Sequence, residues 1–368
     1  MHKTRAAVMR ALGAPMTIET ISVSDPAAGE VLVRMAAAGI CGSDVHVRDG
    51  RYPVAIPGVG GHEGAGFVEA VGPGVTRFEV GDLVVQTFIG PCGECTNCSR
   101  GLRTFCSHGR LSDGTMADGT HRFFDTDGEP LGNHLGLGSF SALTVTPQQH
   151  LVKIPRDVPV DVAALVSCGV ATGVGAAVNV AEVQPGQNVV VVGFGGVGAA
   201  AVMGAVLAGA ARIIAVDVNP AKEALALEFG ATDYLDARTT DVARAVADIT
   251  EGAGANAVLL TPMAIRQEQW EMAIDCCGAA GVVVEVGGAH DHDVIPVPPW
   301  KLMPQKSIMG TTFGGTDPTR EARRWIELYR AGRLPVDRLI TRRYGLDEIN
   351  DAFDDLEAGR NLRGVIVY

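Results

Sequence analysis

The sequence predicts a two-part α/β protein, in which a β-rich lobe accompanies a doubly wound parallel sheet. Three observations lead to this prediction. Short strands broken by glycine and proline fill the first third of the chain, strands alternate with amphipathic helices from Gln187 onward, and a glycine-rich turn opens that second part. The 368 residues suit two domains, and a hydrophobic content of 47% can fill two cores.

The β-rich lobe is predicted from apolar runs that are too short for helices. Such runs cover residues 29–40, 64–72 and 81–87, and glycine or proline interrupts each of them. The junction between the two parts is expected near the glycine-rich stretch at residues 167–177.

Four cysteines follow the last of these runs in the pattern C-x2-C-x2-C-x7-C. They are Cys92, Cys95, Cys98 and Cys106. Four thiolates so close together suit one tetrahedral zinc ion with no open position, and such an ion would brace a lobe. Two disulfides or an iron–sulfur cluster are the alternatives, but an expected reducing compartment and the spacing favour zinc.

The second part begins with an apolar strand, a glycine turn, a helix of small residues and a second strand. Gly193, Gly195 and Gly198 form G-x-G-x-x-G, and residues 193–198, which include Gly196 and Val197, are expected to bind a pyrophosphate. Asp217 lies 19 positions after Gly198 at the end of the second strand, where a carboxylate can accept hydrogen bonds from ribose hydroxyls. This pattern predicts a Rossmann domain that prefers NAD to NADP. An Asx turn is the alternative role for Asp217.

Strands and helices continue to alternate beyond Asp217. A helix ends at Gly230 before a third strand, residues 242–252 form a helix, 255–261 a fourth strand, 268–280 a helix and 281–289 a fifth strand. This helix would contain Cys276 and Cys277, for which packing is a sufficient role. Such alternation predicts a parallel sheet with helices on both faces.

The charge of the chain excludes two classes of partner. The formal charge is −12, with 30 Lys and Arg residues and no basic cluster, so neither nucleic acid nor an anionic membrane is expected. Residues 1–11 are charged without an apolar core after them, and no apolar run reaches the length of a membrane span. We therefore expect a cytoplasmic protein.

A second metal site would have to assemble from distant residues. Cys41, His62, Glu63 and Cys168 all stand in glycine-rich surroundings that let the backbone turn sharply. Two thiolates and an imidazole leave a fourth position on zinc for water or substrate, as a catalytic site requires. Taken singly, each residue is more often a buried or surface side chain, and their combination carries the prediction.

The chain resembles the zinc-dependent medium-chain alcohol dehydrogenases over its whole length, most closely the class III-like type. GHEGAG at 61–66, the four-cysteine loop, CGVATG at 168–173, GFGGVG at 193–198 and NLRGVIVY at 361–368 occur in that order. The resemblance implies a GroES-like catalytic domain from residues 1–169 and 313–368, with a structural zinc lobe at 90–110. It also implies a Rossmann NAD-binding domain at 170–312 and substrate in the cleft.

The resemblance implies roles for the residues of the catalytic site. Cys41, His62 and Cys168 would hold the catalytic zinc, with Glu63 close behind it. Ser43 and His46 would relay the alcohol proton, although a turn hydroxyl and a surface imidazole are the alternatives. Asp44 would orient His62, unless it serves only as a helix cap.

The resemblance also implies contacts with the cofactor. Asp217 and Lys222 would bind the adenosine ribose, Thr172 would lie near the nicotinamide, and Arg363 would reach the pyrophosphate. Solvated surface charges are the alternative for Lys222 and Arg363. Gly42 departs from the family, because many members place Arg or His there. One phosphate contact is therefore expected to be missing.

Five positions match the substrate pocket of the family. They are Phe88, His134, Leu135, Gly288 and Thr312. Small residues at the last two suggest a cavity larger than a short primary alcohol needs. The expected reaction is hydride transfer between an alcohol and NAD+, with two zinc ions per subunit, or reduction of the aldehyde or ketone by NADH.

Several alternatives remain open at this stage. Within the enzyme class these are oxidation of a thiol adduct of formaldehyde and an oxidoreductase that retains and recycles its NAD. A zinc-free quinone-reductase-like enzyme would lack Cys41, His62 and Cys168, and a non-enzymatic NAD-binding protein would not need Ser43 and His46. In the family that the chain resembles, a long excursion such as residues 109–136 accompanies dimers more than tetramers. The resemblance therefore implies a homodimer whose coenzyme sheets join edge to edge.

Overall fold

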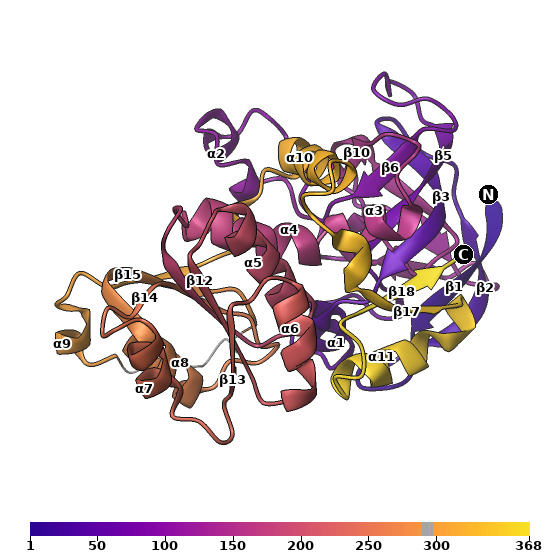
Figure 1. The fold of residues 1–368 in the computed structure, drawn as a ribbon. Helices are drawn as coiled ribbons and strands as arrows, with labels where there is room; N and C mark the ends of the chain where they lie inside the picture. Colours follow the sequence, from indigo (N-terminus) through magenta and orange to yellow (C-terminus); the bar gives the residue numbers. More distant parts are fainter. Residues whose placement is uncertain (289–293, 295–296) are drawn as a thin grey trace. The chain divides into compact units, whose positions relative to one another are not determined.

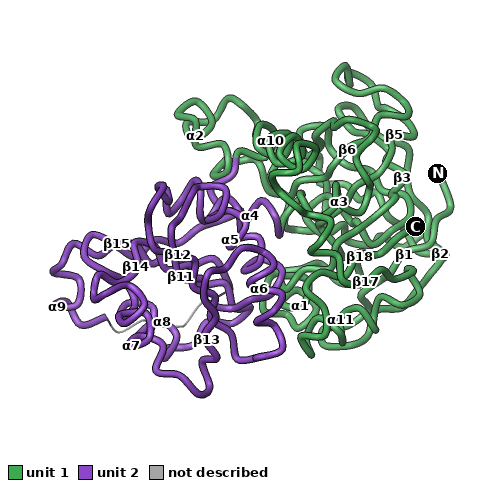
Figure 2. The backbone as a smooth tube through the Cα atoms, viewed as in Figure 1, with its two compact units in different colours: residues 1–168, 317–368 green, residues 169–316 purple. Residues whose placement is uncertain are grey.

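The computed structural model describes residues 1–288, 294 and 297–368, and it divides into two compact units (Figure 2). Unit 1 consists of Met1–Cys168 and Asp317–Tyr368, and unit 2 of Gly169–Thr316. Figure 1 labels their helices and strands.

The strands of unit 1 form a closed barrel and a second sheet. The barrel has the order β1-β2-β7-β8-β4, and the sheet has the order β10-β6-β5-β3-β18-β17, with β9 paired to β3. The strands are β1 (His2–Met9), β2 (Thr17–Val23), β3 (Glu30–Gly39), β4 (Gly58–Val59), β5 (Glu63–Val71), β6 (Leu83–Gln86), β7 (Phe123–Phe124), β8 (Pro130–Asn133), β9 (Leu143–Pro147), β10 (Leu151–Lys153), β17 (Ile340–Tyr344) and β18 (Arg363–Val367).

The sheet brings both parts of unit 1 together. Strand β3 is almost entirely buried, as its apolar sequence requires, and it pairs with β5 and β9 as well as with β18. In the β3–β18 pair, Gly39 stands opposite Val365. The return of the chain to the first domain, which the resemblance implies, is therefore built into the sheet (Figure 1).

Helices cover the sheet of unit 1, and α3 packs on β3 and β5. The sequence of α10 explains why this segment is helical. Asp317 accepts hydrogen bonds from the backbone of Thr319 and Arg320, while the apolar face buries Trp325 and Ile326. The helices are α1 (Gly42–Arg48), α2 (Thr96–Ser99), α3 (Val160–Val166), α10 (Pro318–Arg330) and α11 (Ile349–Glu357).

The excursion after the four-cysteine loop is fastened to the start of β3 in the second sheet. Arg122 Nε and Nη2 donate to the two carboxylate oxygens of Glu30, at 2.7 and 2.8 Å, and Arg122 also pairs with Asp118. Arg122 and Glu30 are both buried, so this bidentate pair fixes the segment that leads into β7.

Unit 2 contains a parallel sheet in the order β13-β12-β11-β14-β15-β16. This is the Rossmann strand order, so the predicted fold class is confirmed. The strands are β11 (Asn188–Val192), β12 (Arg212–Asp217), β13 (Asp233–Asp236), β14 (Ala255–Leu260), β15 (Cys277–Glu285) and β16 (Ser307–Gly310). The helices are α4 (Gly169–Gly175), α5 (Gly196–Leu207), α6 (Glu223–Glu228), α7 (Val242–Ile249), α8 (Gln267–Cys276) and α9 (Pro299–Leu302).

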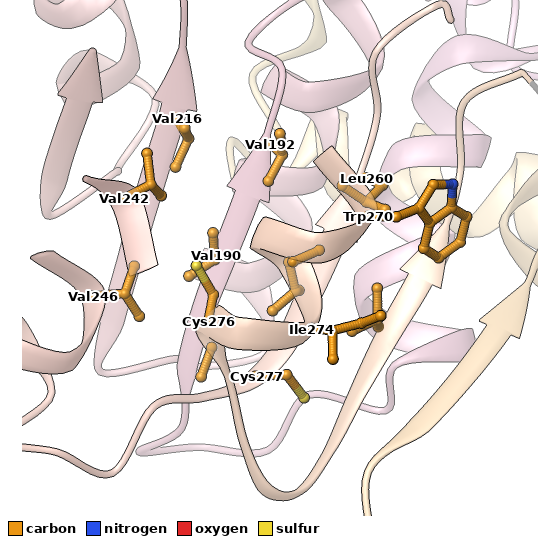
Figure 3. Packing of buried hydrophobic residues seen from close by; sticks show 14 of the residues in the cluster. Val190, Val192, Val216, Val242, Val246, Leu260, Trp270, Ile274, Cys276 and Cys277 are labelled. Atoms are coloured by element: carbon orange, nitrogen blue, oxygen red, sulfur yellow. The ribbon is translucent and has the colours of Figure 1, made fainter. Parts of the chain in front are cut away.

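The core of unit 2 lies between its sheet and helices α7 and α8 (Figure 3). Val190 and Leu260 from the strands pack with Val246 and Trp270 from the helices, and all four are buried. Cys276 and Cys277 belong to this cluster, which gives both a packing role.

The predicted helix over residues 268–280 is wrong in its last part. Helix α8 ends at Cys276, and Cys277 is the first residue of β15. Cys277 pairs instead with Ala255 of β14, and the next pair of the ladder is Ala257 with Val282, after a register shift. This tertiary pairing overrides the local pattern.

Among the described residues, no single helix has both the length and the apolar character needed to cross a membrane. Two short neighbouring stretches, Val160–Val166 and Gly169–Val180, meet that test only when they are counted together.

Candidate active site

The residues predicted to hold the catalytic zinc converge at one end of the β3–β5 hairpin. Gly39 and Glu63 are paired, so Cys41, just after β3, and His62, just before β5, come to the same edge. Cys168 follows α3, which packs on both strands. The ligand atoms of Cys41, His62, Glu63 and Cys168 all lie within 4.8 Å of one another.

Hydrogen bonds orient these side chains. His62 Nδ1 donates to Asp44 Oδ1 at 2.8 Å, so His62 Nε2 is free to act as a ligand. Asp44 Oδ2 also accepts from the backbone N–H of Cys41, at 3.0 Å. Ser43 Oγ lies 3.1 Å from both Cys41 Sγ and His62 Nε2. The structure therefore brings together six of the residues that the sequence analysis assigned to this site.

The electrostatics of the site fit a divalent cation. The hydrogen bond from Cys168 lowers the pKa of the Cys41 thiol well below its ordinary value, while the same bond and burial raise the pKa of Cys168. Burial opposes a charge on His62, but the Asp44 carboxylate holds the pKa of this imidazole well above its ordinary value. Cys41 is therefore the group of this site that ionises most readily, and a bound zinc ion would replace the protons of Cys168 and His62.

Arg363 lies behind this centre in unit 1. It is buried, and its Nη2 donates to Glu63 Oε2. Burial raises the pKa of Glu63 to about 7, against the opposing charge of Arg363. The expected contact between Arg363 and a pyrophosphate stays a prediction, because the structure places this guanidinium on Glu63.

His46 lies further along α1 and is buried. Its ring centre is 5.2 Å from that of Tyr52, and Arg51 Nη1 lies 3.4 Å from His46 Nδ1. Arg51 and Tyr52, which follow the helix in sequence, therefore lie against the His46 ring. Its part in a proton relay with Ser43 stays a prediction.

Two predicted pocket residues of unit 1 stand beside His62. The ring centre of Phe88 lies 6.1 Å from that of His62, and the ring centre of His134 lies 6.0 Å from it. Burial, with a smaller contribution from the charge of His62, lowers the pKa of His134 to about 3. His134 is therefore a neutral imidazole at this site. Leu135 follows it with a positive φ of 54°.

Arg110 is a residue near this pocket that the sequence analysis does not single out. Its Cζ lies 6.0 Å from the ring centre of Phe88. Nothing in the sequence distinguishes Arg110 from the other arginines of the same loop, so only the tertiary structure could identify it.

The four cysteines of the loop at residues 92–106 also form a cluster. Their sulfurs lie within 4.8 Å of one another, and the eight cysteines of the chain are all free. The sulfurs of Cys92 and Cys106 lie 3.5 Å apart, which is far longer than a disulfide bond. Backbone N–H groups of Cys98 and Ser107 lower the pKa of Cys95 to about 5, while burial raises that of Cys98 to about 12. The thiol set suits one closed zinc site.

The predicted glycine loop connects β11 to α5 in unit 2. Gly193 has a φ of 87°, and a Cβ on Gly198 would come within 1.9 Å of the carbonyl oxygen of Gly193. A Cβ on Gly195 would meet nothing within 4 Å, which leaves room for a ligand. Asp217, at the end of β12, accepts from Phe194 N at 2.6 Å and from Lys222 Nζ at 3.1 Å.

Two further details concern this loop. Asp217 also accepts from Asn219 N, so the Asx turn that was the alternative role is present beside the contact with the glycine loop. Thr261, which the sequence analysis did not single out, donates from Oγ1 to the carbonyls of Val192 and Gly193 and so fastens the turn. Its place directly after the strand at 255–260 is the signal that could have identified it.

The remaining predicted residues of unit 2 lie in three places. Thr172 is partly buried in α4, Gly288 forms an isolated bridge with Ala264, and Thr312 precedes a single helical turn at Phe313–Gly315. Their roles near a nicotinamide or a substrate stay predictions.

Known proteins resemble this chain along its whole length. Residues 27–156 match the alcohol dehydrogenase GroES-like domain, and residues 196–328 match the zinc-binding dehydrogenase domain. An NDMA-dependent alcohol dehydrogenase of Amycolatopsis methanolica is 40% identical over 100% of this chain and 99% of its own length. Alcohol dehydrogenase B of Mycobacterium tuberculosis is also 40% identical, over 100% of this chain and 98% of its own.

A solved structure also resembles this chain over its whole length. The benzyl alcohol dehydrogenase of Acinetobacter calcoaceticus superimposes with a TM-score of 0.93 at 33% identity, over 100% of this chain and 99% of that one.

Proposed function

Because the chain belongs to the zinc-containing medium-chain alcohol dehydrogenases, we propose that it transfers a hydride between an alcohol and NAD. The observation that carries the proposal is the convergence of Cys41, His62 and Cys168, whose ligand atoms lie within 4.8 Å of one another. A zinc ion held by these three residues would supply the Lewis acidity that makes an alcohol hydroxyl acidic near neutral pH.

The residues around that position handle the proton. Ser43 Oγ lies against both Cys41 Sγ and His62 Nε2, so it is placed to accept the proton of an alcohol bound there. His46 would pass the proton outward, as the family resemblance implies. Asp44 keeps the proton of His62 on Nδ1 and so leaves Nε2 free as a ligand.

Asp217 supports NAD as the cofactor in preference to NADP. Its carboxylate stands at the end of β12 beside the glycine loop, where it would accept ribose hydroxyls and repel a 2′-phosphate. A comparison of kcat/KM with the two cofactors tests this choice. A higher value with NADP would refute it.

The pocket residues support an aromatic or otherwise bulky alcohol as the substrate. Phe88 offers apolar surface beside His62, and the family resemblance implies that Leu135 also faces the substrate. The similarity to a benzyl alcohol dehydrogenase favours the same class. Turnover of ethanol that clearly exceeds turnover of benzyl alcohol would contradict it.

Metal analysis combined with activity tests the whole proposal. The purified chain should carry two zinc ions and should produce the near-ultraviolet absorbance of NADH with NAD+ and an alcohol. Cys41→Ser should lose activity and one zinc while its fold is retained. One zinc in the unmodified chain would mean that one of the two sites is wrong.

A second candidate is an oxidoreductase that retains and recycles its NAD. The relative named as an NDMA-dependent alcohol dehydrogenase favours it. NAD that stays with the protein through gel filtration and is released by acid would support retention. A protein that is purified without NAD and depends on added NAD+ would support the first candidate.

Assembly and location extend the proposal. The edge strand β16 leaves Met309 45% exposed, which favours the homodimer in which sheets join edge to edge. Light scattering during gel filtration would measure the mass.

Free thiols at all eight cysteines favour a reducing compartment and hence the cytoplasm.

A further inference from the structure

The loop that follows β12 in unit 2 is built around Asp217, the residue proposed to accept the ribose hydroxyls of NAD. Asp217 Oδ1 accepts from the backbone N–H of Asn219 at 2.9 Å, and Asp217 Oδ2 accepts from Lys222 Nζ at 3.1 Å. The side chain of Asn219 in turn accepts from the backbone N–H of Ala221 at 3.1 Å. The position of the carboxylate is therefore coupled to the position of the Asn219 backbone.

Tyr234 fastens this loop from the neighbouring strand. Its hydroxyl donates to the carbonyl oxygen of Asn219 at 2.6 Å. In the ladder of β12 and β13, Tyr234 stands opposite Ala215, so its side chain reaches past the end of β12 to the loop. Asn219 is thus held at both of its backbone groups, because its N–H bonds to Asp217 and its carbonyl accepts from Tyr234.

The surroundings of Tyr234 keep its hydroxyl protonated. Burial, together with the negative charges of Asp217 and Asp236, raises the pKa of Tyr234 to about 12. The hydroxyl therefore stays a hydrogen-bond donor throughout the neutral range. Without it, Asn219 O would keep the backbone N–H of Lys222, at 3.1 Å, but would lose the bond that comes from β13.

We infer that Tyr234 is a positioning residue for the cofactor, because through Asn219 it holds Asp217 where the carboxylate accepts the hydroxyls of the adenosine ribose. The inference rests on the proposed dehydrogenase function and deepens it by adding a residue of β13 to the cofactor site. Tyr234 acts through the loop, so its effect should be confined to ligands that carry ribose hydroxyls.

Two nucleotides that differ only in the ribose test the inference, by isothermal titration of the zinc-loaded full chain freed of any retained NAD. ADP carries both ribose hydroxyls, and 2′,3′-dideoxy-ADP carries neither. The variant is Tyr234→Phe, which removes the hydroxyl and keeps the ring. Tyr329→Phe is the matched control, because Tyr329 is also partly buried but lies on α10 in unit 1. Thermal unfolding of each variant shows whether the fold is retained.

The unmodified chain should bind ADP more tightly than dideoxy-ADP, because Asp217 accepts the ribose hydroxyls. Tyr234→Phe should weaken ADP by about threefold to tenfold, the value of one hydrogen bond, and should leave dideoxy-ADP within about twofold. The KM for NAD+ should rise by a similar factor, while the KM for the alcohol stays within about twofold. Tyr329→Phe should change none of these constants.

Three results would overturn the inference while hydride transfer from an alcohol to NAD stands. One is a Tyr234→Phe variant that binds ADP as tightly as the unmodified chain. Another is a variant that loses ADP and dideoxy-ADP equally, which would indicate a purely structural role for Tyr234. The third is an unmodified chain that binds both nucleotides equally, because Asp217 would then not recognise the ribose. An unmodified chain that binds neither ADP nor NAD+ would overturn the proposed function together with the inference.

Discussion

His62 Nδ1 lies 2.8 Å from Asp44 Oδ1, and both side chains are almost completely buried. Asp44 also accepts from the backbone N–H of Cys41, so one carboxylate fixes two neighbouring ligands of the candidate zinc. The geometry of the metal centre therefore depends on a residue that would not touch the metal itself.

Asp44→Asn should weaken the catalytic zinc. An amide cannot stabilise His62 as the carboxylate does, and loss of such an orienting partner typically costs 10- to 100-fold in metal affinity. Competition with a chelator should release one zinc from this variant at about a tenfold to hundredfold lower chelator concentration. The zinc of the four-cysteine loop should be retained. Asp49→Asn, at the other end of the same helix, is the matched control, and equal zinc release from both variants would contradict this role for Asp44.

Gly198→Ala and Gly195→Ala should have different consequences. A Cβ at position 198 would meet the Gly193 carbonyl oxygen at 1.9 Å, so this variant should lower the unfolding temperature and lose NAD binding. A Cβ at position 195 has open space around it, so that variant should fold normally and bind NAD more weakly. Calorimetry and NAD titration measure the two effects. Equal unfolding temperatures for the two variants would contradict the assignment.

The sequence was most informative where the structure depends on local patterns. The glycine turn, Asp217 and the first five parallel strands follow from neighbouring residues, because a strand, a tight turn and a helix N-terminus each have a local signature. Strand β16 has only four residues, three of them exposed, and it offered no such signature. The local sequence predicts that Cys277 is helical, because no helix breaker precedes it, whereas it is the first residue of β15.

The metal centre depends on non-local contacts. The pairing of β3 with β18 joins residues more than 300 positions apart, and only the family resemblance predicted that the chain returns to the first domain. The same limit applies to Arg110 and to the Arg363–Glu63 pair, because each contact is set by strand register and loop packing. The residue types were therefore enough to indicate the zinc ligands. The structure was needed to identify the residues that surround them.

Arg363→Met should destabilise unit 1 because it leaves the buried carboxyl group of Glu63 without its partner. Removal of one member of a buried ion pair typically costs about 3–5 kcal/mol, and protonation of Glu63 would reduce this cost. Urea unfolding at a fixed zinc concentration measures the free energy. The double variant Glu63→Gln with Arg363→Met should recover part of the loss. A double variant less stable than the single one would show that the pair is not the cause.

His150 should make the stability of the protein depend on pH. Burial lowers the pKa of His150 from 6.5 to about 4, against the hydrogen bond to Thr87 O. Above pH 6.5 both states are neutral, and between pH 6.5 and 4 only the unfolded state gains the proton. The free energy of unfolding should therefore fall by about 3 kcal/mol across this range on account of His150.

The variant His150→Gln isolates this contribution. Urea unfolding of both proteins at several pH values should give a smaller decrease for the variant between pH 6.5 and 4. The same slope in both proteins would show that His150 is not responsible.

Anomalous diffraction at the zinc absorption edge is the most direct test of the central claim. We expect one peak at about 2.3 Å from the sulfurs of Cys41 and Cys168 and about 2.0 Å from His62 Nε2. A second peak should lie among the four cysteines of the loop at residues 92–106. A crystal of the zinc-loaded protein with the loop peak present and no peak between Cys41, His62 and Cys168 would contradict the account.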